Sequence, residues 1–82
     1  MQNDRVLRKH ASLVDRMADR VGVDLEESVL RGDIPPDLIP DLVLRCTNCT
    51  NPESCKRLLA ATSTLETAPS YCVNRETFEK LQ

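Results

Sequence analysis

Four cysteines constrain this chain more than any other feature, because they fall at short and unequal spacings in only 82 residues. The pattern is Cys46-x2-Cys49-x5-Cys55-x16-Cys72, which is a close triplet followed by one distant cysteine. A domain of about 80 residues is marginal on core burial alone, and metals or disulfides commonly compensate. We therefore expect one domain over residues 1–82 that is stapled by its four thiols.

The composition excludes several classes of protein. Hydrophobic residues make up 40% of the chain, but there is one Tyr, one Phe and no Trp, so a base-stacking platform for nucleic acid is not expected. Eleven basic and thirteen acidic residues leave a net charge of −2, which gives no strong field toward nucleic acid or membranes. The apolar runs are far shorter than the ~20 residues of a membrane span. No secretory signal is visible, so we expect a cytoplasmic protein.

Hydrophobic spacing predicts an all-α fold, a small bundle of four to five short helices. No segment alternates with a period of two, and no Asn-Gly or Asp-Gly hairpin turn occurs. The first expected helix has about five turns, with Asn3 or Asp4 as its cap and Gly22 at its end, and the second is short, with Asp24 as its cap and Leu25, Val29 and Leu30 pointing inward. A third helix is expected over residues 37–45. A fourth starts at Pro52 with Asn51 as its cap, and a fifth covers residues 75–82 with Asn74 as its cap. Residues 62–70 are expected to form a loop.

The loop over residues 46–55 favours a metal centre. Cys46 and Cys49 belong to a Cys-x-x-Cys pair, which lets two thiolates of one loop bind one centre. Cys55 falls in the first turn of the expected fourth helix, where the positive end of the helix dipole stabilises negative charge. Cys72 precedes the last helix and would close the site. We therefore predict that Cys46, Cys49, Cys55 and Cys72 together hold a metal ion or cluster.

Other interpretations of the cysteines stay open at this point. Two disulfides would require an oxidising compartment, and separate thiols could simply be buried in the core. A redox pair of Cys46 and Cys49 would lack the βαβ context of thioredoxin-like sites. Among metals, structural zinc usually takes two close cysteine pairs, whereas this chain has a close triplet and one distant cysteine, so spacing alone leaves both zinc and an iron–sulfur cluster open.

The cysteine loop resembles two unrelated groups of iron–sulfur proteins. The WhiB-like regulators and the helix-hairpin-helix DNA glycosylases hold a four-iron four-sulfur cluster on Cys-x2-Cys-x5-Cys, often with a proline between the second and third cysteines. The matching residues here are Cys46, Cys49, Pro52 and Cys55. Those families place the fourth cysteine upstream, whereas Cys72 lies downstream, so the resemblance is one of loop spacing.

Over nearly its full length the chain resembles a family of small proteobacterial domains of unknown function. The shared segments are Arg16-Met17-Ala18, Leu30-Arg31-Gly32, Leu44-Arg45-Cys46 with Cys49, and Tyr71-Cys72-Val73-Asn74 with Phe78. This resemblance implies that the four cysteines form one set, and it implies no activity.

A few other residues bear on the site. His10 is the single histidine and falls on the apolar face of the first helix, which favours a structural role over a ligand role. Tyr71 and Phe78 flank Cys72 and are expected to shield it from water. Three basic residues near the cysteines either face solvent or offset thiolate charge; these are Arg45, Lys56 and Arg57.

These observations and resemblances predict a small cytoplasmic helical protein with a structural or redox-sensing role and an unidentified protein partner. Its four cysteines are expected to bind a four-iron four-sulfur cluster, narrowly favoured over zinc. The first alternative is an adaptor or regulatory module with a structural zinc or disulfide staple. The second is a thiol-disulfide redox protein. An enzyme is otherwise not expected, because no catalytic triad, carboxylate pair or phosphate loop is present.

Overall fold

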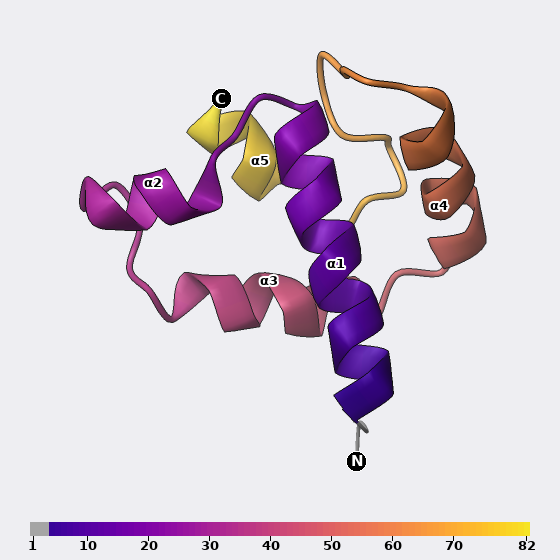
Figure 1. Cartoon of the computed structure of the whole chain (residues 1–82), viewed down its shortest axis with the longest axis horizontal. Coiled ribbons are helices and arrows are strands. Elements are labelled where there is room, and N and C mark those ends of the chain that lie inside the picture. Colours follow the sequence, from indigo (N-terminus) through magenta and orange to yellow (C-terminus); the bar gives the residue numbers. More distant parts are fainter. Residues whose placement is uncertain (1–3) are drawn as a thin grey trace.

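A computed structural model describes residues 4–82, and this part of the chain contains five helices and no strand. The all-α prediction is therefore confirmed. The molecule is flat, with extents of 32 × 32 × 17 Å. The helices are α1 (Asp4–Arg20), α2 (Leu25–Leu30), α3 (Leu38–Cys46), α4 (Pro52–Ala61) and α5 (Arg75–Leu81) (Figure 1).

Helix α1 is the element on which the core is built. It packs against α3 and α4 (Figure 1). Its buried side carries Leu13, Val14 and Met17 at spacings of one and three residues, as expected for an amphipathic helix. Leu42 of α3 and Leu59 of α4 are fully buried members of the same apolar cluster. The predicted apolar face of the first helix is thus the face that forms the core.

The end of α1 also fixes the C-terminal half of the chain through polar contacts. The Arg20 guanidinium donates from Nε to the carbonyl of Thr62 at 2.9 Å and from a terminal nitrogen to the carbonyl of Leu59 at 3.3 Å. These carbonyls lie at the end of α4, where no further turn of helix satisfies them. The side-chain amide of Gln82 donates to the carbonyl of Val21 at 3.1 Å. One end of α1 therefore holds the ends of both α4 and α5.

The predicted boundaries of α1 and α2 agree with the structure where it describes them. The Asp24 carboxylate accepts a hydrogen bond from the Glu27 amide at 3.0 Å and caps α2. Gly22 and Gly32 follow α1 and α2 with φ angles of 79° and 78°, the left-handed conformation that glycine adopts at helix ends. Asn3, one of two candidate caps for α1, lies outside the described residues.

The predicted inward face of α2 is wrong at Leu30. This side chain is 79% exposed, whereas Ser28 is buried and donates to the carbonyl of Asp24 at 2.9 Å. Leu25 is buried and Val29 is half-buried, as predicted. Helix α2 is six residues long, which is less than two turns, so it can turn only one narrow side to the core.

The predicted side-chain caps at Asn51 and Asn74 are also wrong. Both residues precede their helices, but neither side chain makes a capping hydrogen bond. Their ψ angles of 49° and 10° depart from the extended conformation that lets a cap side chain reach the first turn. The Asn74 side chain is instead buried and donates to the carbonyl of Leu42 at 2.8 Å, which joins the turn before α5 to α3.

We predict that Asn74→Ala lowers the free energy of unfolding by about 2 kcal/mol, because it removes the buried hydrogen bond that joins the turn before α5 to α3. Denaturant unfolding followed by circular dichroism measures the loss. Asn51→Ala is the matched control, since the side-chain amide of Asn51 bonds only the exposed hydroxyl of Thr50. Equal unfolding midpoints for the two variants would contradict a structural role for the Asn74 amide.

Candidate metal centre

The structure brings the four cysteines to one cavity of about 20 Å³. Cys46 is the last residue of α3, Cys49 follows in the next turn, Cys55 lies in the first turn of α4, and Cys72 precedes α5. Cys72 therefore joins the triplet although sixteen residues separate it from Cys55. The other lining residues are Leu13, Val14, Tyr71, Val73, Asn74 and Phe78.

The four thiols are free and do not lie within disulfide distance of one another. Within residues 4–82, no three Cys, His, Asp or Glu side chains are arranged so that they could hold one metal ion. A tetrahedral zinc site with bonds of about 2.3 Å would bring its sulfurs to roughly 3.8 Å from one another. The thiols thus share a cavity without forming either a disulfide staple or a preformed single-ion site.

Burial and mutual proximity keep three of the thiols protonated. Burial, reinforced by the charges of Cys49, Cys55 and Cys72, raises the pKa of Cys46 to about 12. Burial is also the main cause that raises the pKa values of Cys55 and Cys72. At neutral pH these three sulfurs are therefore uncharged and can lie together without repulsion. As thiolates they would need a cation to balance their charge.

His10 contacts the site directly. Its ring is buried on α1, and Nδ1 lies 3.3 Å from Sγ of Cys46. Burial, with the nearby charges of Lys9 and Lys56, lowers the pKa of His10, which favours the neutral ring. A neutral ring protonated at Nδ1 donates to the sulfur. The sequence placed His10 on the core-facing side of α1, but it did not reveal this contact with a cysteine 36 residues away.

Backbone amides approach two other sulfurs through a repeated local pattern. Sγ of Cys49 accepts from the amide of Asn51 at 3.5 Å. The amide of Asn74 hydrogen-bonds Cys72, which opposes the rise in the pKa of that thiol. Both contacts arise from Cys-x-Asn immediately before a helix, first at α4 and then at α5. The repeated Cys-x-Asn pattern is visible in the sequence, and it is the signal from which these two contacts between backbone amide and sulfur could have been predicted.

The basic residues next to the cysteines in sequence have other partners. Arg45 donates to the hydroxyl of Thr77 at 3.4 Å, Lys56 pairs with Glu53 at 3.6 Å, and Arg57 donates to the hydroxyl of Ser54 at 3.4 Å. The positive charge that opposes the rise in the pKa of Cys55 comes from Arg16 of α1. The two expected aromatic residues do line the cavity, where Phe78 is almost fully buried and Tyr71 is partly buried.

Comparison with known proteins shows the family. The model of DUF6455, a family of unknown function, matches residues 1–82, and the chain belongs to this family. No curated protein and no solved structure was found to match it. Within the described residues, no helix is long and apolar enough to cross a membrane.

The raised pKa of Cys46 predicts slow alkylation of the metal-free, reduced protein, because the thiolate is the reacting form. A pKa near 12 instead of 9.0 predicts that iodoacetamide at pH 8 reacts at Cys46 at least about 100-fold more slowly in the folded chain than in the unfolded one. Peptide mass spectrometry after timed quenching measures the rate at each cysteine. The same protein in guanidinium is the control, and an equal Cys46 rate in the two states would contradict the prediction.

Proposed function

We propose that this protein is a small metal-binding protein in which Cys46, Cys49, Cys55 and Cys72 hold one four-iron four-sulfur cluster, with a structural or redox-sensing role in a reducing compartment such as the cytoplasm. The observation that carries the proposal is the gathering of all four free thiols around a single cavity. Four is the number of thiolates that such a cluster commonly takes. Free thiols persist in reducing compartments, which is the basis for the location.

The surroundings of the sulfurs support thiolate ligation. Three sulfurs each have a nitrogen within reach, from the His10 ring for Cys46 and from backbone amides for Cys49 and Cys72. N–H groups directed at sulfur stabilise its negative charge, and hydrogen bonds of this kind tune a cluster's reduction potential. Cys55 is buried in the first turn of α4, where the helix dipole has the same effect.

A bound cluster would supply one-electron redox chemistry and binding energy that adds to the stability of the fold. The chain's own residues would orient the sulfurs and exclude water. Phe78 and Tyr71 cover the cavity, and His10 joins the site to α1 through Cys46. A change at the metal centre would therefore act first on α1, the helix on which the core is built.

Zinc is the second candidate, and the size of the cavity favours it. A volume of about 20 Å³ is that of roughly one water position, which suits a single ion better than a cluster. The Cys-x2-Cys-x5-Cys loop that opens onto α4 favours the cluster.

Protein purified without oxygen distinguishes the two metals. We predict a brown preparation with a broad absorption band at the blue edge of the visible, iron and sulfide in similar amounts, and bleaching in air, because sulfur donates charge into iron. Zinc has a filled d shell and gives no such band. A colourless protein that contains one zinc would show that the site binds zinc and not a cluster. A colourless chain that takes up neither metal on reconstitution would contradict the proposal of a metal centre.

Ligand variants test the assignment of the four cysteines. Cys72→Ser should abolish the colour and, because metal binding adds to folding free energy, lower the melting temperature by several degrees. His10→Gln is the matched control: it removes the ring that contacts Cys46 but leaves all four thiolates, so the metal content should stay unchanged. Full metal content in Cys72→Ser, or its loss in His10→Gln, would show that the ligand set is a different one.

A further inference from the structure

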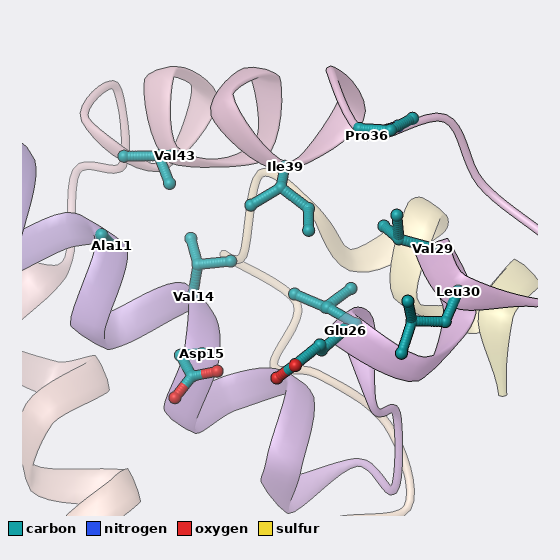
Figure 2. A pocket seen from close by; sticks show the side chains of 10 residues that line it. Ala11, Val14, Asp15, Glu26, Val29, Leu30, Pro36, Ile39 and Val43 are labelled. Carbon is teal, nitrogen blue, oxygen red and sulfur yellow. The ribbon is translucent and has the colours of Figure 1, made fainter.

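An apolar surface between α1, α2 and α3 is left without a partner in the fold. It contains two adjoining depressions of about 300 and 350 Å³ that share Ala11 of α1 and Val43 of α3. Figure 2 shows Val14, Ile39 and Val29 directed into the first depression from three different helices. We call the two depressions together the α1–α3 groove. No cysteine lines the groove, and Val14 is the one residue that lines both the groove and the thiol cavity.

Exposed leucines lie at the two ends of the α1–α3 groove. Leu30 of α2, at one end, is 79% exposed, and Leu44 of α3, at the other, is 51% exposed. These are two of the three large hydrophobic side chains that are exposed in the described part of the chain. A groove bounded by exposed leucines is typical of an interaction surface, because water otherwise meets a continuous apolar strip.

The charges of the α1–α3 groove have opposite signs at its two ends. Arg8 lines the depression that contains Leu44, whereas Asp15 and Glu26 line the depression that contains Leu30. Both carboxylates lie at the edge away from α3 (Figure 2). All three charged side chains are exposed, and within residues 4–82 none of them makes an ion pair or a side-chain hydrogen bond.

Helix geometry makes this arrangement complementary to itself. Arg8 and Asp15 are seven residues apart on α1, which is about two turns or 10.5 Å, so they share a face but lie too far apart to pair within one chain. The midpoint between them falls at Ala11 and Ser12, whose small side chains let two helices approach closely. If two copies of α1 cross antiparallel at this midpoint, Arg8 of each copy meets Asp15 of the other.

We propose that the α1–α3 groove is the interface of a two-fold symmetric homodimer in which α1 packs antiparallel against α1 of a second copy. A two-fold interface must be self-complementary. Here the two-fold axis places the basic end of the groove in one copy against the acidic end in the other, and Leu44 of one copy near Leu30 of the other. The flat shape offers broad faces of about 32 × 32 Å.

Analytical ultracentrifugation of the full chain under reducing conditions, from micromolar to millimolar concentration, tests the proposal. The expected result is a reversible monomer–dimer equilibrium that weakens at high salt. Arg8→Asp and Asp15→Arg should each raise the dimer dissociation constant by about tenfold or more, because each reversal places two like-charged pairs in the interface. Ala11→Glu should do the same, since it brings two carboxylates together near the symmetry axis.

The double variant with Arg8→Asp and Asp15→Arg is the decisive one. It exchanges the two charges, so the pairs form again and the dissociation constant should return to within about threefold of its original value. Glu76→Arg on α5, also an exposed charge without an ion pair, is the control and should leave the equilibrium unchanged. Circular dichroism checks that each variant keeps its helix content.

Three results would overturn the proposal. The chain could stay monomeric at all concentrations, it could dimerise regardless of the charge reversals, or the double variant could fail to recover. A monomeric chain that binds a basic amphipathic helical peptide in the α1–α3 groove would assign the groove to a partner of another sequence.

Discussion

Burial of one face of α1 is the constraint on which the rest of this structure depends. A helix of 17 residues with an apolar face is not stable alone in water and must be covered by other elements. Helices α3 and α4 provide that cover, and Leu13 and Val14 of the same face line the thiol cavity. Core and candidate site are therefore two parts of one surface of α1. A substitution on this face would alter both together.

Much of the fold could be predicted because its signals are local. The spacing of apolar residues in α1, proline at the start of α4 and the Asp24 cap each act within one or two turns of helix. The failures at Leu30 and Asn74 have a different origin. Each depends on what an adjoining element covers or accepts, as when the Asn74 amide reaches the Leu42 carbonyl 32 residues away. Short helices and polar turns carry too few residues to determine such contacts.

The candidate site divides in the same way. Spacing alone grouped the three cysteines around the start of α4, and the placement of Cys72 before α5 suggested the fourth. The contact of His10 with Cys46 could not be predicted, because it requires α1 to lie beside the end of α3. The Arg16 charge near Cys55 depends on the packing of α1 against α4 for the same reason. The contribution of α1 to the site consists of tertiary contacts, and the local pattern of a single sequence does not determine such contacts.

The separation in sequence between α1 and its partners has a consequence for how the chain folds. The contacts of His10 with Cys46 and of Arg20 with Thr62 close loops of 36 and 42 residues. Individual helices form within about a microsecond, but loops of this length must lose their closure entropy before contacts in the core offset it. Closure of these two loops is therefore slower than the formation of a single helix. Because α1 is not stable while its apolar face is uncovered, it becomes persistent only when these loops close.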